Sequence, residues 1–195
     1  VSMLLDMRQR RLEPSVTTYS AAISACEKDA QWHEALTLIS DMQCRCIEPN
    51  LVAYSAAASA CEKGAQCHEA RGIFSDMQQR CLEADVIVYN AVISSYEKSA
   101  HWHEALGMIS NMRQQLVEAD VITYSAAISA CEKGALWHEA LSVLSTMRLS
   151  RLEPNEITYS AATSACEKGA QWQIGMGMCL DMLSCRNDPV AMTYN

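Results

Sequence analysis

The sequence is poor in the residues that interrupt regular structure. It has only four prolines and seven glycines among 195 residues, whereas 50% of its residues are hydrophobic. Disordered chains have the opposite balance, so this composition argues against disorder. No run approaches the ~20 apolar residues of a membrane-spanning helix, and no signal or transit peptide is visible. We therefore expect a folded chain with no membrane partner.

The sequence also lacks an excess of positive charge. Its 15 lysines and arginines are outnumbered by 23 acidic residues, which gives a formal net charge of −8. Bulk charge therefore does not indicate a strongly basic nucleic-acid-binding protein. Any surface that binds anions would have to be a local stripe on an acidic body.

Motifs for catalysis and for metal binding are missing as well. No nucleophile, base and orienting group recur in a single cleft, and there is no glycine-rich phosphate loop, so we expect neither an enzyme nor a cofactor nor a small-molecule substrate. A histidine precedes a glutamate at 35-residue intervals: His33, His68, His103 and His138. That spacing is too wide to share an ion, and the H-E-x-x-H motif is absent, so packing or solvent exposure is favoured.

What the sequence does contain is a fixed period. A tyrosine recurs every 35 residues, at Tyr19, Tyr54, Tyr89, Tyr124, Tyr159 and Tyr194. A period of this length is typical of stacked helical repeats. Starting each unit three residues before its tyrosine gives repeats 16–50, 51–85, 86–120, 121–155 and 156–190. Residues 1–15 match the second helix of a truncated repeat and 191–195 the start of a further one, so we expect a segment of a longer array.

Each repeat is predicted to form two helices. Apolar residues recur at helical spacing in the first half of repeat 1, at Tyr19, Ala22, Ile23 and Cys26, and in its second half, at Trp32, Ala35, Leu36, Ile39 and Met42. The first helix should end near Asp29, where later repeats have Gly64, Ser99, Gly134 and Gly169. The predicted fold is all-α: a tetratricopeptide-like αα-hairpin solenoid, wound as a right-handed superhelix with first helices lining the concave side. The fifth repeat is degenerate, because Gly175 and Gly177 weaken its second helix.

Four of the ten cysteines share one repeat position: Cys26, Cys61, Cys131 and Cys166. Stacked helices lie roughly 8–10 Å apart, whereas the Cα atoms of a disulfide lie within about 7 Å. We therefore expect reduced thiols in a core, as in a reducing compartment.

The motifs of the repeat resemble those of a known family. Repeat 4 begins Val121-Ile122-Thr123-Tyr124-Ser125, carries Glu139-Ala140-Leu141 in its second helix and Met147 before the connection, and closes with Glu153-Pro154-Asn155. Together with the 35-residue period, these motifs resemble pentatricopeptide repeat proteins of the plain class. The resemblance implies single-stranded RNA binding with one base per repeat, in RNA processing or stabilisation in a chloroplast or mitochondrion. No cytidine-deaminase signature is present.

The resemblance also implies which residues contact RNA. In the family, the fifth and last residues of a repeat contact the base edge. Here these pairs are Ser20 with Asn50, Ser55 with Asp85, Asn90 with Asp120, and Ser125 with Asn155; Ser160 is paired with the apolar Val190. The second residue packs on the base face, which assigns Thr17, Val52, Ile87, Ile122 and Ile157. The family's pairing rules imply that repeats 1 to 4 read A, G, U and A in 5′ to 3′ order.

One lysine per repeat could form a phosphate track: Lys28, Lys63, Lys98, Lys133 and Lys168. Each lysine follows a glutamate, so the net positive potential along the row of lysines is weak unless the lysine and glutamate side chains point apart. A solvated helix face is the alternative for these lysines.

Other interpretations remain open for the predicted contacts. The Asn or Asp that ends each repeat is also a favourable N-cap for the next helix, and the fifth-position serines could be small polar residues on a solvated face. A protein-binding scaffold is the second candidate function, favoured by the acidic charge. A third is an RNA-editing or cleavage enzyme whose catalytic domain lies outside this segment.

Overall fold

The computed structural model describes residues 13–171 and 173–178, and all regular structure in this part of the chain is helical. Its labelled helices are α2 (Val16–Lys28), α3 (Trp32–Cys44), α4 (Leu51–Lys63), α5 (Cys67–Gln79), α6 (Val86–Lys98), α7 (Trp102–Gln114), α8 (Val121–Lys133), α9 (Trp137–Leu149) and α10 (Glu156–Lys168). Residues 173–178 are also helical. The predicted all-α fold of paired helices is confirmed. The predictions for residues 1–12 and 179–195, Val190 included, fall outside the described residues.

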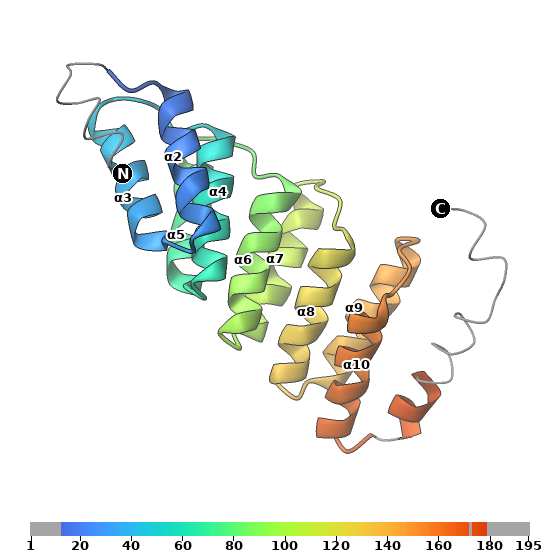
Figure 1. The fold of residues 1–195 in the computed structure, drawn as a ribbon. Helices are drawn as coiled ribbons and strands as arrows, with labels where there is room; N and C mark the ends of the chain where they lie inside the picture. The colour runs from blue at the N-terminus through green and yellow to red at the C-terminus, as the bar shows by residue number, and fades with distance from the viewer. Residues whose placement is uncertain (1–12, 172, 179–195) are drawn as a thin grey trace, which may run out of the picture. The chain divides into compact units, whose positions relative to one another are not determined.

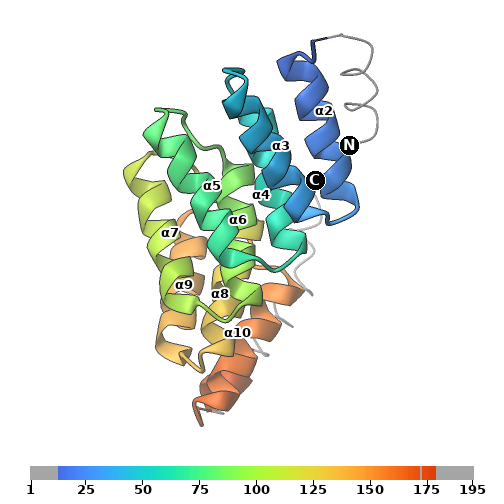
Figure 2. The same ribbon diagram turned by 90° about the vertical axis from the view of Figure 1, so that its left-hand side faces the viewer.

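The chain divides into two compact units, Val1–Ser95 and Tyr96–Asn195. In the first unit, α2 lies beside α4, and α3 packs against both. In the second unit, α8 lies beside α10, and α9 packs against both (Figures 1 and 2). Within each unit, first helices therefore pack on first helices and second helices cover them, as the repeat pattern predicts. The handedness of the superhelix and its concave side stay predictions.

First helices begin at a polar capping residue. The side chains of Asn50, Asp120 and Asn155 each accept a hydrogen bond from the backbone N–H three residues later, and Asp85 accepts one from Val88 N at 3.0 Å. Such a bond satisfies one of the otherwise unpaired N–H groups of the first helical turn. The capping interpretation is therefore confirmed for the last residue of repeats 1 to 4.

Each first helix ends at a lysine, next to the end predicted at Asp29 and its equivalents. The glycine that follows this lysine in three repeats does not adopt a left-handed conformation. Gly64 and Gly134 both have an ordinary φ of −80°, whereas the next residues, Ala65 and Ala135, have φ values of 54° and 55°. The glycines instead make room for a tryptophan of the preceding repeat. A Cβ on Gly64 would lie 2.5 Å from Cδ1 of Trp32.

The core is built from the residues that the repeat pattern marks. Tyr19, Tyr54 and Tyr89 are at most 1% exposed, and the recurring methionines Met42, Met77, Met112 and Met147 are fully buried. The cysteines of the shared position are buried and form no disulfide. Burial raises the pKa of Cys61 to about 12 and that of Cys131 to about 11, so both are protonated thiols at neutral pH.

A buried tyrosine hydroxyl ties together helices of neighbouring repeats in the first unit. Tyr54 of α4 donates a hydrogen bond to Asp76 of α5. Gln43 Nε2 of α3 lies 2.7 Å from the same carboxylate, and Arg80 Nε lies 3.1 Å from it. One carboxylate therefore links three helices. None of the helices among the described residues has the length and apolarity that crossing a membrane requires.

Candidate nucleic-acid interface

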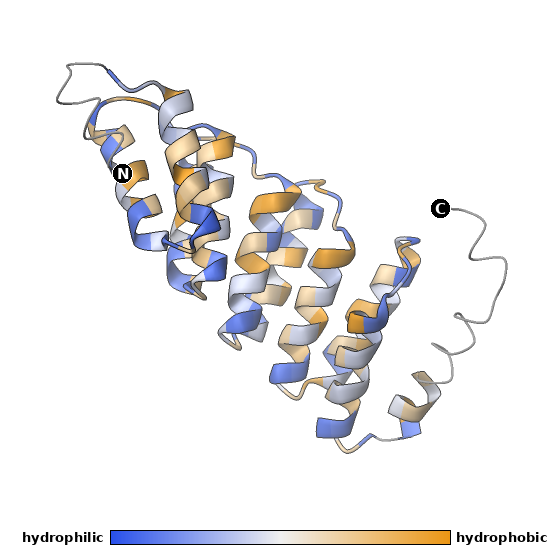
Figure 3. Ribbon diagram, in the orientation of Figure 1, coloured by the Kyte–Doolittle hydropathy of each residue, from blue (hydrophilic) through white to orange (hydrophobic). Residues whose placement is uncertain are grey.

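One feature stands out at the start of the first helices: an exposed, branched apolar side chain at the second position of repeats 2 to 5. Val52 is 57% exposed, Ile87 54%, Ile122 61% and Ile157 64%, and Thr17 is exposed at the same position in repeat 1. Figure 3 shows the apolar start of α8 and its hydrophilic end. Because these side chains bury little surface in the fold, they are available to cover the flat face of a ligand.

The two base-edge residues of repeat 1 are in direct contact. Ser20 Oγ lies 3.1 Å from Asn50 Oδ1 and 2.9 Å from Val16 O, and its one proton can go to either acceptor. Asn50 Oδ1 in turn accepts the backbone N–H of Ala53 at 3.0 Å. The side chain of Asn50 is thus held by α4 and by Ser20, and Asn50 remains exposed to solvent.

The corresponding residues of repeat 4 meet through a third side chain. Thr158 Oγ1 donates to Asn155 Oδ1 at 2.7 Å and lies 2.9 Å from Ser125 Oγ. Asn155 Oδ1 also accepts the backbone N–H of Thr158 at 2.9 Å. The sequence pattern did not identify Thr158, because its position is occupied by Ala53 and Val88 in repeats 2 and 3.

The remaining predicted base-edge residues lie near the starts of first helices or cap them. Ser55, in the first unit, donates to Leu51 O at 2.8 Å, and Asp85 of the same unit caps α6. Asn90 lies on α6 in the first unit, and Asp120 caps α8 in the second. Ser160 is exposed near the start of α10.

An open depression of about 420 Å³ lies between α8 and α10 in the second unit. It is lined by Ser129, Glu132, Glu156, Ile157, Ser160, Ala161 and Ser164. It therefore brings together the predicted base-packing and base-edge residues of repeat 5. Ser129 and Ser164 were not predicted from the sequence, although a serine recurs at the same position of every repeat: Ser24, Ser59, Ser94, Ser129 and Ser164.

Three of the recurring lysines pair with the glutamate of the preceding repeat. Lys63 Nζ lies 3.0 Å from Glu27 Oε1 and 3.1 Å from Glu27 O, and Lys133 Nζ lies 2.6 Å from Glu97 Oε1. Lys168 and Glu132 make the same pair at 2.9 Å. These contacts bridge the ends of neighbouring first helices. The predicted contact of the lysines with phosphate stays a prediction.

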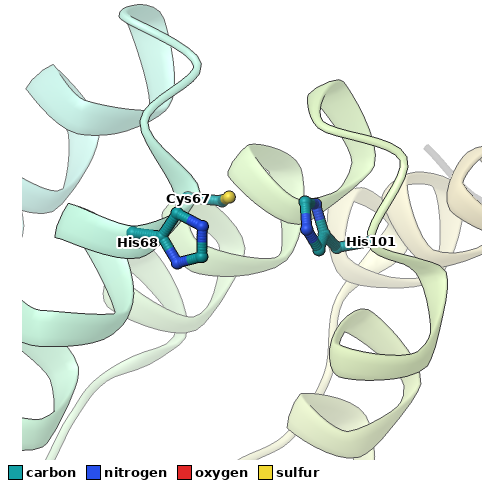
Figure 4. A group of neighbouring side chains, drawn as sticks. All are labelled: Cys67, His68 and His101. Atoms are coloured by element: carbon teal, nitrogen blue, oxygen red, sulfur yellow. The ribbon is translucent and has the colours of Figure 1, made fainter.

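The recurring histidines are exposed to solvent near the start of the second helices, in line with the expectation of packing or solvent exposure. The ring of His138 stacks on Trp137 with centroids 3.4 Å apart. Figure 4 shows Cys67, His68 and His101, residue types that bind metals. Cys67 and His68 begin α5 in the first unit, whereas His101 precedes α7 in the second, so we assign no metal site to them.

Sequence profiles of pentatricopeptide repeats match most of the chain. The pentatricopeptide repeat domain matches residues 2–64 and 37–99, the PPR repeat family residues 84–133, and the PPR repeat residues 122–152. No curated protein matches the sequence.

Solved structures show the same fold. The crystal structure of the pentatricopeptide repeat protein PPR10 from maize is 23% identical, with a TM-score of 0.72 over 96% of this chain and 27% of PPR10. PPR10 in complex with an 18-nt psaJ RNA element is 22% identical, with a TM-score of 0.62 over 94% of this chain and 25% of that one.

A third structure is the PPR domain of Arabidopsis thaliana protein-only RNase P 1 in complex with tRNA. It is 14% identical, with a TM-score of 0.72 over 84% of this chain and 88% of that domain. The chain thus spans about a quarter of the length of PPR10 but most of this shorter domain. The matching profiles and the helical repeats together establish that the chain belongs to the pentatricopeptide repeat family.

Proposed function

We propose that the chain binds single-stranded RNA selectively, with one base per repeat. The observation that carries this proposal is the contact between the two base-edge positions, direct in Ser20–Asn50 and relayed in Ser125–Asn155. An unpaired base has an apolar face and a polar edge. A repeat offers a group for each: an exposed aliphatic side chain such as Ile122 for the face, and for the edge a polar pair whose serine, Ser125, lies on the same helix.

The relatives support RNA as the partner, because PPR10 has been solved with an RNA element and the PPR domain of protein-only RNase P 1 with tRNA. We propose that repeats 1 to 4 of this chain read A, G, U and A from 5′ to 3′. The chain would act by staying bound to a transcript in a chloroplast or mitochondrion, and would catalyse no reaction itself. Its binding would protect, remodel or position that transcript.

The lysines would serve as secondary contacts in this proposal. An ammonium group has three N–H donors, and Lys63 directs its group at Glu27 Oε1 and Glu27 O. A phosphate would therefore have to share the lysine with a glutamate. This competition should make the electrostatic part of RNA binding weak, in keeping with the net charge of −8.

A protein-binding scaffold is the alternative function. Leu116 is 89% exposed and Leu149 84%, and both lie at or just beyond the end of a second helix. Large apolar side chains with this exposure are suited to protein contacts. Substituting them with serine should leave RNA binding unchanged under the RNA proposal.

Repeats 2 and 3 provide a matched test of base reading, because both have Asp as the last residue and differ at the fifth, Ser55 against Asn90. We expect Asn90→Ser to change the preference at the third base from U to G, and the reciprocal Ser55→Asn to change the second from G to U. Fluorescence anisotropy with oligoribonucleotides that vary one base at a time measures both. A change spread over all positions, or none in either variant, would overturn the proposal.

A further inference from the structure

We propose that Thr158, the third residue of repeat 5, is a positioning residue that sets which hydrogen-bonding groups the Ser125–Asn155 pair presents to a base. The inference rests on the proposed function and deepens it. It adds a residue from the following repeat to the pair that reads the fourth base.

The first step is the position of Thr158 itself. Its side chain is fully buried, and its hydroxyl lies between the two base-edge residues, 2.7 Å from Asn155 Oδ1 and 2.9 Å from Ser125 Oγ. A threonine hydroxyl has a single proton. Because that proton goes to the amide oxygen of Asn155, Thr158 can only be an acceptor in a hydrogen bond with Ser125.

The second step concerns Ser125. Its only proton has two possible acceptors, Thr158 Oγ1 at 2.9 Å and Val121 O at 2.7 Å. Both acceptors belong to the protein. Whichever accepts the proton, the hydroxyl of Ser125 is left with lone pairs and acts as an acceptor toward a ligand.

The third step concerns Asn155. Its Oδ1 accepts both the backbone N–H and the hydroxyl of Thr158, so the two lone pairs of that oxygen are used. The amide is thereby fixed with its oxygen on the helix, and its NH₂ group is what remains for a ligand. Donor and acceptor side by side match adenine, whose Watson–Crick edge has an amino donor beside the N1 acceptor.

Repeat 1 shows what happens without the hydroxyl. The same Ser–Asn pair is present, but Ala53 stands at the position of Thr158. Ser20 then contacts Asn50 directly at 3.1 Å and is only 6% exposed, whereas Ser125 is half-buried. The threonine therefore acts as a spacer that leaves the serine more accessible, so the two repeats should read adenine with unequal strength.

The test uses the full chain and fluorescein-labelled single-stranded oligoribonucleotides that contain A-G-U-A, with the first or fourth base replaced in turn by C, G or U. Thr158→Val keeps the shape and removes the hydroxyl. We expect it to lower the preference for adenine at the fourth base by about threefold to tenfold, the effect of one net hydrogen bond, and to leave the first base unaffected. Thr158→Ser should retain the preference.

Two further variants complete the design. Thr18→Val is the matched control, because Thr18 has the same register but contacts the N-cap Ser15 rather than a base-edge residue; it should change no base preference. Ala53→Thr adds the missing hydroxyl and should raise the preference for adenine at the first base. Circular dichroism melting of each variant separates loss of folding from loss of selectivity.

The outcomes distinguish the inference from the function on which it rests. If the unmodified chain prefers adenine at the fourth base and Thr158→Val keeps that preference, the inference is overturned and the proposed function stands. If the unmodified chain has no preference there, both are overturned. If Thr158→Val does not fold, Ala53→Thr decides, and the absence of a gain at the first base overturns the inference.

Discussion

At the scale of single residues, the carboxylate of Asp76 holds neighbouring repeats together, because it contacts Tyr54 of its own repeat and Gln43 of the preceding one. Burial raises the pKa of this carboxyl group, but hydrogen bonds from Tyr54, Arg80 and Gln43 outweigh it, and the net pKa lies below the ordinary value of 3.8. Burial together with Asp76 raises the pKa of Tyr54 to about 12. At physiological pH, Tyr54 therefore stays neutral and Asp76 stays anionic.

The lowered pKa of Asp76 predicts a loss of stability in acid. A group whose folded-state pKa is depressed stabilises the fold above its unfolded pKa, and this contribution disappears as pH falls through the folded pKa. We expect the free energy of unfolding, measured by urea denaturation, to fall as the pH is lowered below about 4. Asp76→Asn should reduce the acid sensitivity. An unchanged pH profile in Asp76→Asn would contradict the assigned role.

Residue roles that depend on sequence neighbours were predictable, and those that depend on the next repeat were not. The capping role of Asn155 follows from its place before a helix. The pairing of Lys63 with Glu27 does not, because Glu62 is the adjacent glutamate and only helix stacking brings Glu27 within reach. Thr158 was missed for the same reason, since its contact with Ser125 crosses from one repeat to the next.

At the scale of helices, the end of a first helix is coupled to the tryptophan that begins the second helix of the previous repeat. Trp32 lies against Gly64, Trp102 against Gly134, and Trp137 against Gly169. Repeat 2 has Cys67 in place of the tryptophan, and the residue in the glycine position of repeat 3 is Ser99. The sequence predicted a helix end at each glycine. It could not predict why glycine is needed there, because the reason is the nearby tryptophan ring, whose position only the structure shows.

This coupling predicts opposite effects for two glycine substitutions. A Cβ at Gly134 would lie 2.7 Å from Trp102 Cδ1, so Gly134→Ala should destabilise the fold by about 1–3 kcal/mol through overpacking. Nothing lies within 4 Å of a Cβ at Gly107, so Gly107→Ala should stabilise its helix by about 0.5–1 kcal/mol.

Thermal and urea unfolding of the two variants measure the difference. Adding Trp102→Cys to Gly134→Ala should recover part of the loss caused by the alanine, because it removes the ring that the new methyl group meets. A Gly134→Ala variant as stable as the unmodified chain would contradict the coupling.

At the scale of the whole molecule, the 35-residue period was sufficient to predict the helix pairs, because each pair has apolar stripes that only a neighbouring repeat can cover. The residues of the base-edge pairs came from the family resemblance rather than from the periodicity. The structure adds that the apolar residue at the second position of repeats 2 to 5, such as Val52 and Ile157, is exposed. Exposure at a fixed repeat position could not be predicted from hydropathy, which marks those residues as core.

The most direct test of the central claim is selection of RNA sequences by the chain from a random single-stranded pool, followed by sequencing of the bound fraction. If successive repeats read successive bases through their fifth and last residues, the bound fraction will be enriched in A-G-U-A in 5′ to 3′ order. Enrichment of unrelated tetranucleotides, or of none, would contradict the claim.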